Sequence, residues 1–78
     1  MTDKEIEKKV IELVAEVLNI DEISLIDSQE NINEWDSMAY LSILARLEDE
    51  FCLEITQENI NNFVSIQRII TEIKNANP

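Results

Sequence analysis

Residues 35–51 of the chain read WDSMAYLSILARLEDEF. Asp and Ser are preferred where a helix begins, and behind them apolar residues recur at helical spacing. The pattern predicts a helix from about Ser37 to Phe51 whose apolar stripe faces a core. The residues of this stripe are Tyr40, Leu41, Leu44, Leu47 and Phe51, with Ile43 on its flank.

Ser37 is the leading candidate for a functional residue because of its place at this predicted helix start. A helix start presents free backbone N–H groups and the positive end of the helix dipole, which suit a covalently attached phosphate. The alternative is that Asp36 and Ser37 only cap the helix.

A first helix is predicted upstream, from Thr2 or Asp3 to Leu18, because Thr2-Asp3-Lys4-Glu5 has the form of a capping box. Residues 19–36 then lose the helical period and favour turns, which predicts a long loop ordered by its own apolar anchors. The expected anchors are Ile20, Ile23, Leu25, Ile26, Ile32 and Trp35.

Two further helices are predicted downstream. Thr56-Gln57-Glu58-Asn59 caps a short third helix that buries Ile60, and Ser65 caps a last helix that runs toward Asn75-Ala76-Asn77-Pro78. The β-branched residues fall at helical spacing, so no strand is expected. The fold class is therefore all-α, a small four-helix bundle with three longer helices and one short one, in a single domain spanning residues 1–78.

The composition excludes several chemistries. The 78 residues contain no histidine, no glycine and one cysteine, so a Ser-His-Asp arrangement, a Cys/His zinc site and a glycine-rich nucleotide loop are all impossible. A glycine-containing calcium loop is also missing. We expect no catalytic residues, no metal site and no enzymatic activity.

The net charge of −11, from 17 acidic and 6 basic residues, argues against binding nucleic acid or an anionic membrane and favours basic protein surfaces. No apolar run approaches the roughly 20 residues of a membrane span, and the first residues do not form a signal peptide. Cys52 alone cannot form an internal disulfide. We expect a cytoplasmic monomer without membrane insertion.

The whole pattern resembles that of the acyl and peptidyl carrier proteins. The shared features are an acidic chain of this length, Asp36-Ser37-Met38 at the start of the second helix, Leu47-Glu48-Asp49-Glu50-Phe51 at its end, and Val64-Ser65-Ile66 at the start of the last. The tripeptide alone is a weak signal, but its spacing to the other two segments is specific.

The resemblance implies that Ser37 receives pantetheine 4′-phosphate from coenzyme A through a separate phosphopantetheinyl transferase. The distal thiol of that group then carries an acyl or aminoacyl thioester, as in fatty-acid, polyketide or nonribosomal-peptide biosynthesis. Asp36 would assist the transferase and its metal ion. Met38, where the family usually has leucine, either contacts the transferase or lies partly buried.

The resemblance also implies a docking surface. Glu48, Asp49 and Glu50, continued by Glu54, are similar to the acidic strip that basic docking surfaces of loading and unloading enzymes contact in this family. A run of acids is otherwise an ordinary solvated face.

Two departures from the family pattern limit the inference. Carriers of fatty-acid synthesis commonly have acids where this chain has Ala39 and Ser42, which suggests a specialised biosynthetic pathway. Cys52 stands where glycine is usual, so a left-handed backbone there would cost about 1–2 kcal/mol. The alternative function is an unmodified acidic helical adaptor that binds a basic protein.

Overall fold

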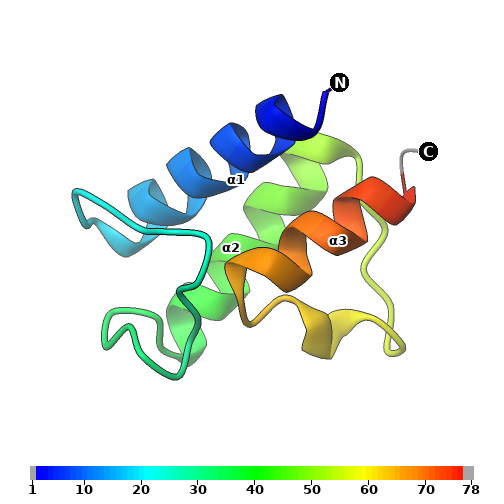
Figure 1. Cartoon of the computed structure of the whole chain (residues 1–78). Helices are drawn as coiled ribbons and strands as arrows, with labels where there is room; N and C mark the ends of the chain where they lie inside the picture. Colours follow the sequence, from blue (N-terminus) through cyan, green and yellow to red (C-terminus); the bar gives the residue numbers. More distant parts are fainter. Residues whose placement is uncertain (1, 77–78) are drawn as a thin grey trace.

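The computed structural model describes residues 2–76 and is all-helical over that range, apart from one isolated bridge between Ser28 and Ser65 (Figure 1). Its elements are α1 (Asp3–Leu18), α2 (Ser37–Phe51), the single 3₁₀ turn η1 (Ile60–Asn62) and α3 (Ile66–Ala76). The predicted class, with three longer helices, one short one and a long first loop, is confirmed. Asn77 and Pro78, included in the prediction for the last helix, lie outside the described residues.

The helix boundaries follow from side-chain caps. The Thr2 hydroxyl accepts a hydrogen bond from the Glu5 N–H at 3.2 Å, and the Ser65 hydroxyl accepts one from the Arg68 N–H at 3.2 Å. Each bond satisfies one of the donors that a helix leaves free in its first turn. The predicted starts of the first and last helices are therefore confirmed.

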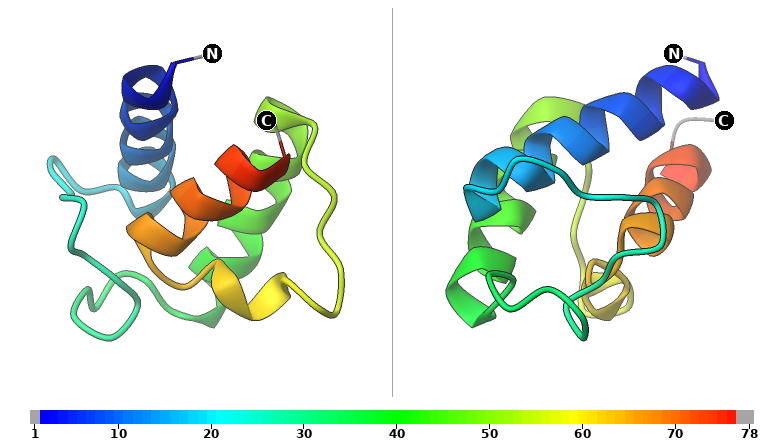
Figure 2. Two further views of the ribbon diagram at one scale, coloured as in Figure 1. Left: turned by 45° about the vertical axis from the view of Figure 1, so that its right-hand side comes forward. Right: turned by 60° about the vertical axis from the view of Figure 1, so that its left-hand side comes forward.

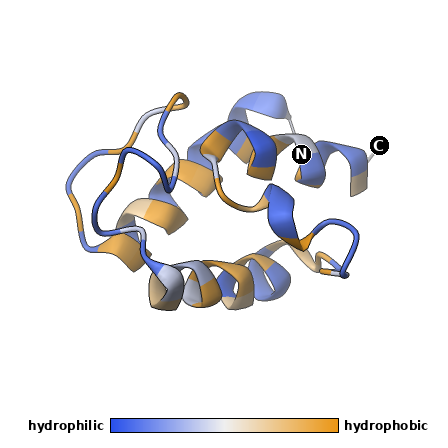
Figure 3. Cartoon of the chain, turned by 90° about the horizontal axis from the view of Figure 1, so that it is seen from below, coloured by the Kyte–Doolittle hydropathy of each residue, from blue (hydrophilic) through white to orange (hydrophobic). Residues whose placement is uncertain are grey.

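The three helices pack around one apolar core, in which α1 contacts both α2 and α3 closely. Each helix in Figure 3 is coloured both orange and blue, because each has an apolar and a polar side. Every fully buried side chain in the described part of the chain belongs to the apolar class. Within residues 2–76, no helix has the length and apolar character needed to cross a bilayer.

The orientation of α2 corrects the predicted apolar stripe. Leu41 was assigned to the core but is 63% exposed, whereas Ile43, assigned to the flank, is fully buried. Two residues advance a helix by about 200°, so these two side chains necessarily lie on opposite sides. The helix turns its Ile43 side inward and exposes Leu41.

The loop from residue 19 to residue 36 crosses from the end of α1 to the start of α3 before it reaches α2 (Figure 2). Two backbone hydrogen bonds hold it there: the Gln29 N–H donates to the Val64 carbonyl at 2.8 Å, and the Ile66 N–H donates to the Asp27 carbonyl at 3.1 Å. The loop is therefore attached to the segment that leads into α3.

Only some of the predicted apolar anchors hold the loop. Ile23 and Trp35 are buried, and Ile20 and Ile32 are partly buried against the core. Leu25 and Ile26 were wrongly predicted as anchors, because they occupy a turn and Ile26 is 82% exposed.

Asp27 organises the turn that exposes these two residues. Its carboxylate accepts hydrogen bonds from the Ser24 N–H at 2.8 Å and from the Asn31 amide nitrogen at 2.9 Å. These donors favour the charged form, and they hold the pKa of the Asp27 carboxyl below its usual value.

The short third element is a single 3₁₀ turn, preceded by a turn in which side chains replace helical hydrogen bonds. The Asn59 side chain accepts from the Thr56 N–H at 2.7 Å and donates to the Glu54 carbonyl at 3.0 Å. Such local bonds compete with helix formation, so the element remains short. Ile60 is partly buried, and the following Phe63 is fully buried.

Within residues 2–76, two residues have left-handed backbones, each directly after a helix: Asn19 at φ 56° and Cys52 at φ 51°. Asn tolerates this region, whereas other residues with a Cβ are strained in it by about 1–2 kcal/mol. The strain anticipated at Cys52 is therefore present.

Replacing Cys52 with glycine should stabilise the fold by about 1 kcal/mol, because the left-handed strain disappears and the exposed thiol contributes little packing. The thermal midpoint should rise by roughly 4–8 °C. Asn19→Gly is the matched control and should change it much less. Equal shifts in the two variants would contradict this explanation.

Asp27→Asn should destabilise the protein near pH 7, since an amide offers one acceptor oxygen where the carboxylate uses two. The lowered pKa means that this stabilisation is present above the unfolded-state value of about 4 and is lost as the pH falls through the folded-state value. The urea midpoints of the two proteins should therefore approach each other as the pH falls below about 4. Asp21→Asn is the control, and a gap that stays constant with pH would disprove the assignment.

Candidate functional site: the start of helix α2

The start of α2 presents a hydroxyl group beside free backbone donors. Asp36 is the N-cap, and its Oδ1 accepts from the Ala39 N–H at 2.9 Å. Ser37, the first helical residue, is exposed, and the N–H groups of Ser37 and Met38 have no acceptor among the described residues. An exposed hydroxyl next to two free donors at the positive end of a helix fits a phosphate ester.

Met38 lies on the surface, where it is 79% exposed. The alternative of partial burial is therefore wrong, and contact with the transferase stays a prediction. Leu41 lies one turn further along and is also exposed, so the first half of α2 displays two large apolar side chains. The sequence analysis placed Leu41 in the core and so missed its exposed position. Because two residues advance a helix by about 200°, Leu41 and Ile43 could not both have faced the core.

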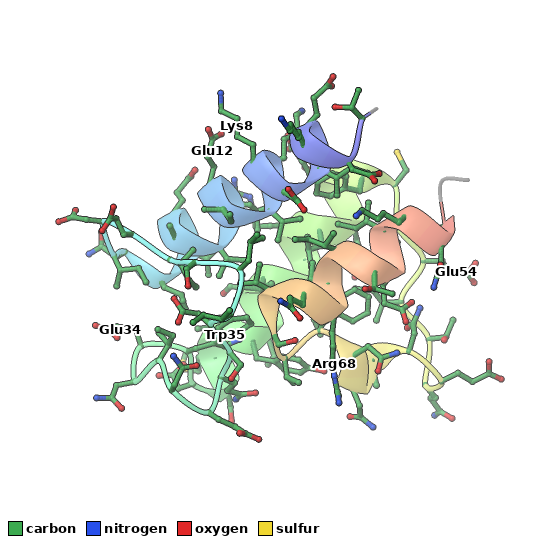
Figure 4. All side chains as sticks on the ribbon, in the orientation of Figure 1. Lys8, Glu12, Glu34, Trp35, Glu54 and Arg68 are labelled. Atoms are coloured by element: carbon green, nitrogen blue, oxygen red, sulfur yellow. The ribbon has the colours of Figure 1, made fainter. Side chains whose placement is uncertain are left out.

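Trp35 fixes the approach of the loop to α2. Its side chain is 1% exposed, and its backbone N–H donates to the Ile32 carbonyl at 3.1 Å. In Figure 4 it lies on the inner side of the loop, near the starts of α2 and α3. The predicted packing role is confirmed. Its indole Nε1 is buried without a protein acceptor, a situation that typically costs about 1–3 kcal/mol.

Tyr40 ties α2 to the 3₁₀ turn. Its hydroxyl donates a hydrogen bond to the Ile60 carbonyl, and burial raises the pKa of the Tyr40 phenol. This contact limits how far η1 can move from the first half of α2. The sequence placed Tyr40 in the core stripe but gave no sign of its polar partner.

The predicted acidic strip lies at the opposite end of α2. Glu48, Asp49 and Glu50 are exposed in its last turns, and Glu54 is exposed in the segment that follows. With a rise of about 1.5 Å per residue, the three helical acids begin about 17 Å from Ser37 along the axis. The structure therefore does not bring the acids and the serine together.

The acids of this strip also differ from one another. Glu50 forms an ion pair with Lys9 of α1 at 3.7 Å, so it is turned toward the neighbouring helix. No ion pair is recorded for Glu48 or Asp49 within the described residues. These two acids are therefore the ones available to a basic partner.

A surface cleft of about 480 Å³ lies between the loop and the start of α3. Its lining residues are Ser28, Gln29, Glu30, Val64, Ser65 and Arg68. None of the predicted site residues lines it. The candidate site at Ser37 is thus an exposed helix start and not part of this cleft.

Comparison with known proteins identifies the family. The family described as "Phosphopantetheine attachment site" matches residues 8–73. The acyl carrier protein of Buchnera aphidicola subsp. Baizongia pistaciae (strain Bp) is 33% identical over 72 residues, which cover 88% of this chain and 91% of that protein. The acyl carrier protein of Buchnera aphidicola subsp. Schizaphis graminum (strain Sg) is 26% identical over 74 residues, which cover 92% of this chain and 94% of that protein.

The chain therefore belongs to the phosphopantetheine-attachment family. Proteins of this family bear phosphopantetheine covalently on a serine, and they are carriers and not enzymes. The resemblance inferred from the sequence is confirmed, and with it the expected cofactor.

Proposed function

We propose that Ser37 bears pantetheine 4′-phosphate and that the chain transports acyl groups as thioesters between enzymes. The observation that carries this proposal is the exposed Ser37 hydroxyl at the first residue of α2, beside two free backbone N–H groups. Membership of a family defined by phosphopantetheine attachment supports it, as do the names of the acyl carrier relatives.

The proposed division of labour follows from the side chains present. Ser37 provides only an attachment oxygen, and the chain contains no histidine to remove its proton. The general base must then come from the transferase. The Oδ1 atom of Asp36 accepts the capping hydrogen bond from the Ala39 N–H. The carboxylate is exposed, so its second oxygen can assist the transferase and its metal ion.

The proposed partners are a phosphopantetheinyl transferase and the enzymes that load and unload the thioester. We assign their contacts to the outward side of α2, where Met38 and Leu41 supply apolar area and Glu48 and Asp49 supply charge. Opposite charge accelerates encounter more than it strengthens the complex. Glu54 extends this surface, and Glu50 contributes less because it is paired with Lys9.

The neutral first half of α2 supports a specialised pathway. Ala39 and Ser42 carry no charge, so an enzyme that relies on acids at these positions would bind weakly. We infer a cytoplasmic monomer that serves partners adapted to this surface. The relatives carry the general name of acyl carrier protein and specify no pathway.

Incubation with coenzyme A and a broad-specificity phosphopantetheinyl transferase should add one phosphopantetheine to the protein. Ser37→Ala should abolish the adduct, because it removes the attachment oxygen, and intact mass spectrometry measures both results. Ser42→Ala, which alters another exposed serine of α2, should leave the adduct unchanged. A folded wild-type protein that gains no mass would instead favour the unmodified adaptor.

Reversing the charge of both Glu48 and Asp49 to lysine should lower kcat/KM for the transferase by about tenfold at low salt, because electrostatic steering is lost. The difference should shrink as salt screens the charges. Lysines near a helix C-terminus are favourable, so thermal stability should not fall. The control is the double variant Glu12→Lys with Glu22→Lys, which makes the same charge change at exposed sites outside α2. An equal fall in kcat/KM in the control would show that the acidic strip has no special role.

A further inference from the structure

One buried polar atom in the described core has no hydrogen-bond partner in the protein. Among the described residues, the Trp35 Nε1 is the single buried side-chain nitrogen or oxygen without a hydrogen-bond partner. A buried tryptophan normally finds an acceptor for its N–H, and a phenylalanine would fill much of the same space without one. The presence of an indole here therefore requires an explanation beyond packing.

The position of this donor connects it to the candidate site. Trp35 directly precedes Asp36, the cap of α2, and lies two residues before Ser37. Its backbone is held by the bond to the Ile32 carbonyl, and Figure 4 places the residue near the starts of α2 and α3. These two helices both pack closely on α1 but do not approach each other to the same extent.

The surroundings define the kind of group that could pair with Trp35. An indole N–H only donates, so its partner must be an acceptor. The core cluster that contains Trp35 otherwise consists of apolar side chains, so a charged partner would be strongly disfavoured. The complementary ligand is thus a mostly apolar chain that carries one neutral oxygen, such as an oxo group.

We propose that the Trp35 indole N–H selects thioester-bound acyl chains that carry an oxo group over fully saturated chains. This inference rests on the proposed function, since the chain must be delivered by the arm on Ser37. It also disfavours aminoacyl cargo, because an ammonium group is charged and cannot accept a hydrogen bond. The arm itself is a poorer partner, because its several polar groups would all have to leave water for one donor.

The chain offers a direct probe, because Trp35 is its one tryptophan and gives one indole N–H signal in a ¹⁵N-labelled sample. The transferase would transfer octanoyl-phosphopantetheine, or one of three counterparts with an oxo group at carbon 3, 5 or 7, from the matching acyl-coenzyme A to Ser37, releasing adenosine 3′,5′-bisphosphate. Intact mass confirms loading, so a failure of attachment is seen separately from a failure of selection.

At least one oxo chain should move the indole proton downfield relative to the octanoyl form, whereas apo, holo and octanoyl proteins should give similar signals. Identical signals for all four cargoes would overturn the proposal. So would a shift that is complete in the holo form, which would assign the donor to the arm. An indole proton that exchanges rapidly with solvent in the apo protein would show that bulk water reaches the donor, which would also overturn the proposal.

Trp35→Phe removes the donor and keeps an aromatic ring. For the oxo chain that shifts the signal, hydroxylamine should cleave the thioester about three to ten times faster in this variant than in the wild type, which corresponds to the loss of one hydrogen bond. Cleavage of the octanoyl thioester should change little, and this comparison separates selection from general loosening of the core. Equal acceleration of both thioesters would overturn the proposal, and if the variant fails to fold, the wild-type indole measurement decides alone.

Discussion

The placement of α2 depends on how an 18-residue loop without glycine is held against the start of α3. The hydrogen bonds from Gln29 to Val64 and from Ile66 to Asp27 fix the middle of this loop, and the buried Trp35 fixes its end. These contacts determine where the loop ends, and therefore where Ser37 lies.

Local signals in the sequence were sufficient to predict the helices. Thr2, Asp36 and Ser65 are capping residues ahead of apolar repeats, and all three cap helices in the structure. Position at the surface was harder to predict, because it depends on which side of a helix or turn meets the rest of the molecule. Leu41 and Ile26 are apolar in the sequence, yet both are exposed, since tertiary packing and the Asp27 turn direct them outward.

The candidate site was likewise predictable where it depends on local sequence and not where it depends on tertiary contacts. The exposed start of α2 follows from the Asp-Ser pair and the helical repeat behind it. The Tyr40 contact with Ile60 and the unpaired indole of Trp35 depend on residues that meet only after folding, so no local pattern indicates them. The pairing of Glu50 with Lys9 is likewise a product of the packing of α1 on α2.

The apolar core and not the charged surface holds the helices together. In the described part of the chain, three exposed ion pairs link α1 to its neighbours, namely Lys9–Glu50, Arg46–Glu16 and Lys74–Asp3. Such pairs contribute little to stability. The large excess of acids is thus available for interaction with other proteins.

The length of α2 separates the two ends of the proposed site by about 17 Å. A partner attracted first to the acidic end need not yet contact the serine end. Encounter rate and reach can then evolve independently: a change near Glu48 alters how fast a partner is captured, while the reach of a group tethered to Ser37 stays the same.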